Sequence, residues 1–270
     1  MTNYSEDEPI LKYEHVDISY AGKKVVSDVS FTLHKGEIMG LVGESGSGKS
    51  TIIKAAMNLL GDDGLVTRGD IWYKNLDLPD VKGEELRKLC GPDLAMIFQN
   101  AGLSMCPIRK IGDQIYESMN EHEKISKEEF LTRVEKIMGI VGLTDYDRIL
   151  DSYPFQLSGG MNQRIGICMA MLLNPKVLLA DEPTSALLTL QHRKKVVEEM
   201  LKMRDEYGTS MIIVTHNIGL VEKMCDTVAV LKDGMIKEFG HAKDVINNPQ
   251  DEYTKLLMKS VIRIKKKHKK

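Results

Sequence analysis

A glycine-rich loop follows directly on a short apolar run, and this pairing leaves few folds open to the chain. The run is Ile38 to Val42, and the loop reads Gly43-Glu44-Ser45-Gly46-Ser47-Gly48-Lys49-Ser50. It matches the pattern GxxxxGK[ST], in which small residues let the backbone wrap around a phosphate and point successive N–H groups at its oxygens. Such a loop connects a strand to a helix, so the sequence predicts an α/β fold with a buried sheet.

The residue types of this loop predict its ligands. The Lys49 ammonium is expected to neutralise charge on β- and γ-phosphates, and the Ser50 hydroxyl is expected to ligate Mg²⁺. The loop residues 43–50 and the adjacent Thr51 are therefore candidate nucleotide-binding positions. Tyr20 precedes the first glycine turn and can stack on an adenine ring, with core packing as the alternative.

Polar side chains follow three further apolar runs. Asp181 and Glu182 come after the apolar run 177–180, where open α/β sheets place their ligands. Asp181 is expected to hold Mg²⁺ through water, and Glu182 is the candidate general base. His216 follows 211–215 and can bond the γ-phosphate or the attacking water, although a lone histidine is often structural. Gln99 follows 94–98 and offers an amide oxygen to Mg²⁺ or water.

A second serine-glycine element lies between the phosphate loop and the acidic pair. It reads Leu157-Ser158-Gly159-Gly160-Met161 and opens a predicted helix from 158 to 174. One chain rarely carries two separate phosphate cradles for one nucleotide. The sequence therefore predicts a nucleotide shared between two subunits.

The hydrophobic pattern divides the chain into sheet and helix regions. Helical periodicity dominates from about 85 to 170, where Ser126 and Glu129 form a capping-box pattern ahead of an apolar face. Sheet patterns come before and after this region. We expect a helix from 50 to 60, an Asp233-Gly234 hairpin turn, and strands at 10–15, 25–33, 38–42, 177–180, 211–214, 227–231 and 235–238.

Composition excludes several classes of protein. No stretch has the roughly 20 apolar residues of a membrane span, and the acidic start of the chain is unlike a signal peptide, so we expect a cytosolic protein. Four scattered cysteines (Cys90, Cys106, Cys168 and Cys225) are expected to be reduced thiols. The segment 263–270 holds six positive charges, which leaves about −8 for the rest. This argues against nucleic-acid binding; the tail is either a solvated terminus or a weak contact for anionic lipid.

Together these elements resemble the ATP-binding cassette (ABC) family of transport ATPases, over residues 11 to 258. The resemblance implies a P-loop NTPase core of the RecA-like kind with an antiparallel β subdomain and an inserted helical subdomain. It places the ATPase domain at 9–258, with the core at 9–85 and 170–245, the helical subdomain at about 86–169, and a C-terminal extension with its basic tail at 246–270. It also implies ATP and Mg²⁺ as cofactors, and Ser158, Gly159 and Gly160 as contacts to the γ-phosphate bound by a second ABC ATPase subunit.

A narrower resemblance is to the oligopeptide, dipeptide and nickel importer subgroup. It rests on four segments: 96–99, 111–115, 153–156 before the serine-glycine element, and Asn248-Pro249-Gln250-Asp251-Glu252-Tyr253-Thr254. The subgroup implies a homo- or heterodimer of ATPase subunits with two integral-membrane permeases and an external substrate-binding protein, at the cytoplasmic face of the cell membrane. Peptides are the first expected cargo, and nickel or a metal chelate is the second.

Two segments depart from the family pattern. Leu188 stands where the family usually has an aspartate, and 100–107 lacks the usual proline pattern. A module that binds ATP and dimerises but hydrolyses poorly is therefore the alternative to a transport motor. Cassette ATPases of translation or DNA repair are less well matched, because the chain has neither a second cassette nor a long coiled coil.

Overall fold

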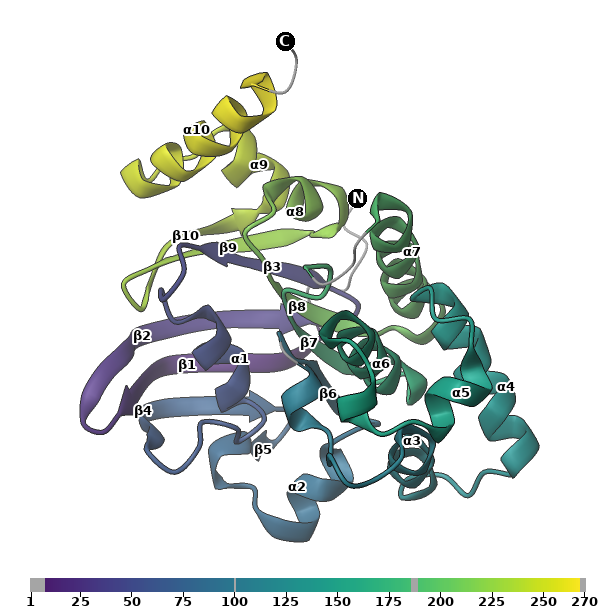
Figure 1. Ribbon diagram of the computed structural model, residues 1–270. Helices are drawn as coiled ribbons and strands as arrows, with labels where there is room; N and C mark the ends of the chain where they lie inside the picture. The colour runs from purple at the N-terminus through teal and green to yellow at the C-terminus, as the bar shows by residue number, and fades with distance from the viewer. Residues whose placement is uncertain (1–7, 100, 186–188, 268–270) are drawn as a thin grey trace. The chain divides into compact units, whose positions relative to one another are not determined.

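The computed structural model describes residues 8–99, 101–185 and 189–267. These residues form two compact units (Figure 1). Unit 1 combines the chain up to residue 82 with the chain from residue 210 onward, and unit 2 comprises residues 83–209. None of the described helices combines the length and the apolar character that a membrane span requires.

An antiparallel sheet occupies the N-terminal part of unit 1. Its strand order is β2-β1-β4-β5. Buried and exposed side chains alternate along much of β2, as expected for a sheet with one face on the core. β4 has no counterpart among the predicted strands. The bounds are β1 Pro9–Tyr20, β2 Lys23–His34, β4 Gly64–Tyr73 and β5 Leu76–Asp77.

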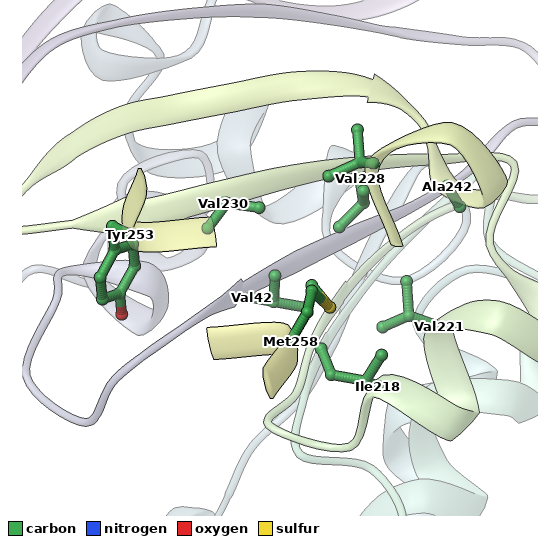
Figure 2. Close-up of a cluster of buried hydrophobic side chains, with 9 residues drawn as sticks. Val42, Ile218, Val221, Val228, Val230, Ala242, Tyr253 and Met258 are labelled. Carbon is green, nitrogen blue, oxygen red and sulfur yellow. The ribbon is translucent and has the colours of Figure 1, made fainter. Parts of the chain in front are cut away.

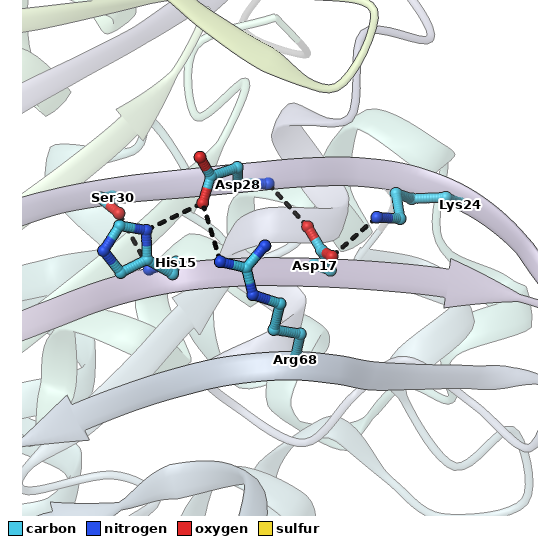
Figure 3. Close-up of polar contacts among 6 residues, drawn as sticks. All are labelled: His15, Asp17, Lys24, Asp28, Ser30 and Arg68. Atoms are coloured by element: carbon cyan, nitrogen blue, oxygen red, sulfur yellow. Dashed lines mark hydrogen bonds and ion pairs between the residues drawn. The ribbon is translucent and has the colours of Figure 1, made fainter.

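The register of this sheet is interrupted at neighbouring positions on three adjacent strands, β2, β1 and β4. His15 on β1 and Asp28 on β2 have φ angles of 52° and 51°, and Gly69 on β4 has a φ of 77°. Figure 3 shows the polar contacts that hold these positions together. His15 Nδ1 lies 2.9 Å from Asp28 Oδ1. The Asp28 backbone N–H and the Lys24 ammonium both donate to the buried Asp17 carboxylate, each at 2.7 Å.

Parallel strands form the second sheet region of unit 1. β3 (Ile38–Gly43) lies between β8 (Ser210–Val214) and β9 (Thr227–Lys232) and is parallel to both. Every residue of β3 and β8 is buried, which fits the predicted apolar runs. β10 (Met235–His241) returns antiparallel to β9. The predicted Asp233-Gly234 turn is confirmed, because both residues have positive φ, 49° and 75°, as a type I′ hairpin requires.

Helices pack on both sides of these parallel strands. α1 (Lys49–Ala55) contacts β2, β3 and β8, and the Tyr13 hydroxyl donates to Ile52 O at 3.0 Å. The expected extension of this helix to residue 60 is wrong. The chain turns at Asn58, whose φ is 52° and whose side-chain amide donates to Leu78 O and Val81 O at 2.7 and 2.8 Å. The other helices are α8 (Ile218–Met224), α9 (Ala242–Asn247) and α10 (Glu252–Lys267), and a 3₁₀ turn, η1, spans Leu78–Asp80.

Unit 2 is mainly helical around two parallel strands. β6 (Leu94–Ile97) pairs with β7 (Val177–Asp181), and both are fully buried. The 3₁₀ turns are η2 (Ala101–Ser104) and η3 (Pro154–Gln156). The helices are α2 (Gly83–Leu89), α3 (Ile111–Asn120), α4 (Lys127–Ile140), α5 (Tyr146–Asp151), α6 (Gly159–Leu172) and α7 (Leu190–Tyr207).

The start and the apolar face of α4 agree with the prediction. Ser126 is its N-cap, and the Ser126 hydroxyl accepts from the Glu129 N–H at 3.2 Å. The Glu129 carboxylate ion-pairs with Arg133. Phe130, Val134 and Met138 of the apolar face that follows the cap are buried, and α4 contacts α6 and α7. Burial of this face stabilises the helical unit, since each such side chain contributes about 1.5–3 kcal/mol.

Candidate nucleotide-binding site

The predicted site residues divide between the two units. Unit 1 holds the phosphate loop 43–50, Thr51, Tyr20 and His216. Unit 2 holds Gln99, the segment 158–160, Asp181 and Glu182.

Gly43 begins the phosphate loop at the end of β3, in contact with β9. A Cβ atom at this position would lie 2.1 Å from Leu231 O, and the φ angle is 153°. Only glycine fits so close to another backbone. Gly46 and Gly48 also have positive φ angles, 82° and 99°. The glycines of the motif thus serve two needs, close approach to β9 and left-handed turns in the loop.

Lys49 folds back into the loop that precedes it. Its side chain is buried, and its Nζ donates to Gly43 O at 2.9 Å, to Glu44 O at 2.6 Å and to Ser47 Oγ at 3.3 Å. The ammonium therefore sits among the loop carbonyls, where a phosphate cradled by the loop N–H groups would meet it. Ser50 and Thr51 follow on the first turn of α1, and both are half-buried.

The hairpin turn between β9 and β10 supports the loop from outside. The Gly234 N–H donates to Ser47 O at 3.1 Å, and Gly234 O accepts from the Ser27 N–H at 2.9 Å. A Cβ at Gly234 would lie 2.2 Å from Val25 O. The turn is therefore tied to β2 on one side and to the phosphate loop on the other.

Tyr20 and His216 lie at the ends of unit 1 strands. Tyr20 is half-buried and pairs with Gly64, where an added Cβ would lie 2.7 Å from the Tyr20 ring. The ring thus lies against the backbone of β4. His216 is exposed beyond the buried end of β8. Asn217, the next residue, caps α8 by accepting from the Leu220 N–H. Adenine stacking and phosphate contact by these two residues stay predictions.

The acidic pair in unit 2 lies at the C-terminal end of β7, as predicted. Asp181 is the last residue of β7 and is 3% exposed. Glu182 is half-buried and has a φ of 52°, a left-handed conformation that is uncommon outside glycine. Glu182 O accepts from the N–H and the hydroxyl of Ser185 at 3.1 and 2.8 Å. A tight turn therefore directs the chain away from the strand immediately after the two carboxylates.

The serine-glycine element forms the N-terminus of α6. Ser158 is its N-cap, and the Ser158 hydroxyl accepts from the Met161 N–H at 3.3 Å. Ser158 and Gly159 are exposed, and among the described residues no atom beyond the neighbouring residues and the backbone of α6 itself lies within 4 Å of a Cβ placed at Gly159. A capped serine still has a hydroxyl proton to donate. This surface has both the donors and the space that an anionic ligand needs.

These elements agree with the comparisons. The sequence model of the family described as "ABC transporter" matches residues 26–185. The chain belongs to the ABC transporter family. It is 39% identical over 263 residues to the dipeptide transport ATP-binding protein DppD of Bacillus subtilis, covering 95% of this chain and 78% of the relative. It is 36% identical to the metal-staphylopine import system ATP-binding protein CntD of Staphylococcus aureus, covering 92% of each.

A solved ABC structure confirms the predicted fold class. The ATP-binding cassette MJ0796, in a dimeric post-hydrolysis state bound to ADP and Pi, superposes with a TM-score of 0.75 at 26% identity, covering 86% of this chain and 99% of that one. The fold is thus the P-loop ATPase fold of ABC cassettes. The predicted division into core and helical subdomain stays a prediction.

Gln163 carries a structural role that the sequence analysis missed. It is 3% exposed in α6; its Oε1 accepts from the Ala101 N–H at 2.8 Å, and its Nε2 donates to Phe98 O. These backbone groups flank Gln99, which is itself exposed. A buried amide two residues after the serine-glycine element thus holds the ends of the Gln99 segment. Gln163 stands between the polar residues Asn162 and Arg164, so the sequence carries no signal that sets it apart.

The segment 186–188, with Leu188, lies outside the described residues, as does residue 100. The departure from the family pattern at Leu188 therefore stays a prediction from sequence.

Proposed function

We propose that this chain is the ATP-binding and ATP-hydrolysing subunit of an importer that carries peptides into the cell. One observation carries the proposal: the Lys49 ammonium is held inside the phosphate loop by Gly43 O and Glu44 O. A buried cation with this placement suits the β- and γ-phosphates of ATP. The similarity to a dipeptide transport protein supports peptides as the cargo.

In the proposed reaction, unit 1 binds the nucleotide. The loop from Gly43 to Ser50 and the adjacent Thr51 surround the phosphates and supply N–H donors to them, and Lys49 neutralises their charge. Tyr20 stacks on the adenine, and His216 bonds the γ-phosphate or the attacking water. The tight seat of Gly43 against β9 supports this role, because a fixed loop loses little freedom when a ligand binds.

Unit 2 contributes the groups that act on the γ-phosphate. Glu182 orients or deprotonates the attacking water. Asp181 and Gln99 of this unit present carboxylate and amide oxygens and Ser50 of unit 1 presents a hydroxyl oxygen, a donor set that fits Mg²⁺. When bound, Mg²⁺ would neutralise charge that develops on the phosphate oxygens. The burial of Asp181 at the end of β7 supports its part in this set.

The proposed assembly contains two ABC subunits, two membrane permeases and an external substrate-binding protein, with the chain at the cytoplasmic face of the membrane. Ser158, Gly159 and Gly160 contact the nucleotide of the second subunit. The exposure of Ser158 and Gly159 at the N-terminus of α6 supports this arrangement. The cassette MJ0796, which was solved as a dimer, offers a precedent for pairing.

The test is ATP hydrolysis by the full chain and by its complex. Glu182→Gln should abolish hydrolysis while ATP still binds. The matched control is Glu198→Gln in the same unit, which removes only a surface ion pair with Lys194 at 3.4 Å, worth little to stability. Equal hydrolysis in wild type and Glu182→Gln would refute the role of Glu182. Absence of ATP binding by the wild type would refute the proposed function.

Import of a metal chelate is the second candidate. It is favoured by the match to the metal-staphylopine import protein, which extends over 92% of both chains, against 78% of the dipeptide transport protein. Uptake of labelled dipeptide and labelled nickel chelate by cells with and without the chain separates the two. We expect dipeptide uptake to depend on the chain; dependence of the nickel chelate alone would replace the first candidate with the second.

A further inference from the structure

Tyr253 connects the C-terminal part of the chain to the sheet that carries the phosphate loop. It lies on α10, is 8% exposed, and belongs to a buried apolar cluster with Val42 of β3, Val230 of β9 and Met258 of α10 (Figure 2). The Lys232 ammonium lies 4.8 Å from the centre of its ring. Packing thus explains the position of the ring, and a phenylalanine would satisfy it equally well.

The hydroxyl of Tyr253 makes a contact that packing does not require. It accepts a hydrogen bond from the backbone N–H of Glu44, the second residue of the phosphate loop, at 3.1 Å. Burial raises the pKa of Tyr253, so the group stays a neutral phenol at physiological pH. The contact joins α10 to the loop across more than two hundred residues of sequence.

This bond and a bond from Lys49 meet on one peptide group. The peptide between Gly43 and Glu44 presents its N–H to Tyr253, and its carbonyl accepts from Lys49 Nζ at 2.9 Å. The described chain contains no cis peptide bond, so the N–H and C=O of this planar unit point in opposite directions. The two side chains therefore hold the same plane from opposite edges. Rotation of the plane would carry the carbonyl away from the ammonium.

We propose that Tyr253 is a positioning residue for Lys49: it fixes the peptide plane that holds the lysine, and so makes α10 part of the nucleotide site. The inference rests on the proposed ATP-binding function. Tyr253 should affect the affinity for ATP rather than kcat, because Lys49 contacts the phosphates equally in the ground state and in the transition state.

The test compares two conservative substitutions at adjacent residues, each of which removes one hydroxyl group. Tyr253→Phe keeps the ring and removes the acceptor of the Glu44 N–H. Thr254→Val is the control: Thr254 is fully buried, and its hydroxyl has no hydrogen-bond partner among the residues that the structure describes. Both variants thus lose one buried hydroxyl in the same turn of α10, but only Tyr253→Phe affects the loop.

Calorimetric titration of the full chain with ATP should give a dissociation constant raised about two- to tenfold in Tyr253→Phe, the effect of one hydrogen bond. Thr254→Val should stay within about twofold of wild type. The KM for ATP should rise in Tyr253→Phe while kcat stays within about twofold. A loss of packing would instead lower thermal stability and kcat together.

Amide hydrogen exchange provides a second measurement. The Glu44 amide should exchange faster in Tyr253→Phe than in Thr254→Val or wild type, because it has lost its acceptor. Unchanged ATP affinity in Tyr253→Phe, or unchanged exchange at Glu44, overturns the positioning role while the wild type still binds ATP. A wild type that does not bind ATP overturns the proposed function as well, so the two failures are distinct.

Discussion

Gln163→Leu should destabilise unit 2 far more than its modest change in shape suggests. Leucine fills nearly the same volume, so little of the effect would come from a cavity. The loss comes from two backbone groups, Ala101 N–H and Phe98 O, that bond the buried amide. Ala101 is 1% exposed, so its N–H has little access to water. Phe98 is half-buried, so its carbonyl is less severely affected.

An unsatisfied buried group costs about 1–3 kcal/mol, so the two together predict a loss of about 2–4 kcal/mol in the free energy of unfolding. Urea unfolding followed by far-ultraviolet circular dichroism measures it. Gln191→Leu is the control, because Gln191 is exposed on α7 of the same unit. A loss below about 0.5 kcal/mol, the range of ordinary surface substitutions, would show that the amide does not anchor these groups.

Gln163→Glu separates the two bonds. A carboxylate can still accept from the Ala101 N–H, but it has no proton to donate to Phe98 O. The variant should therefore be less stable than wild type at neutral pH and should recover part of the loss at acidic pH, where the protonated acid becomes a donor. A loss that does not depend on pH would contradict this assignment.

Two further predictions concern the antiparallel sheet of unit 1. In the folded protein the bond from Lys24, then that from the Asp28 N–H, lowers the pKa of Asp17. Asp17 therefore contributes fully to the free energy of unfolding above the unfolded pKa of about 4, and this contribution is lost as pH falls through the lower folded pKa. Urea titrations followed by Trp72 fluorescence should show that Asp17→Asn loses less stability at acidic pH than wild type does. Equal losses in the two proteins would contradict the prediction. Gly69→Ala should cost at least about 2 kcal/mol, because its Cβ would lie 2.2 Å from Glu14 O. Gly61→Ala has the same φ of 77° and meets no described atom within 4 Å beyond its neighbours in the chain, so it should cost about 1–2 kcal/mol. Equal losses of stability in thermal unfolding would refute the clash at Gly69.

The sequence predicts best those elements whose residues interact with their neighbours in the chain or with the core as a whole. β3, β7 and β8 are runs of buried apolar residues, and the turn at Asp233-Gly234 is a local choice of backbone conformation. β4 was missed because most of its residues are at least partly exposed, so that its apolar pattern is weak.

Contacts between distant residues account for the other failures. The end of α1 depends on Asn58, whose side-chain amide donates hydrogen bonds to carbonyl groups 20 and 23 residues further along the chain. Gln163 reaches back 62 residues to Ala101. The bond from Glu44 to Tyr253 spans 209 residues. The motifs identify which residues can bind a phosphate, but they carry no information about which side chains hold those residues in place.

The left-handed backbone conformation of Glu182 implies that the stability of the fold and the proposed catalytic function favour different residues at this position. A residue with a side chain is strained by about 1–2 kcal/mol at such a φ angle, and glycine is not. Selection for a longer-lived fold alone would therefore favour glycine at 182. If the carboxylate performs the proposed hydrolysis, function keeps glutamate at this position. Natural variants without transport activity should then drift toward glycine at 182. An engineered cassette with glycine at 182 should gain thermal stability and lose ATP turnover.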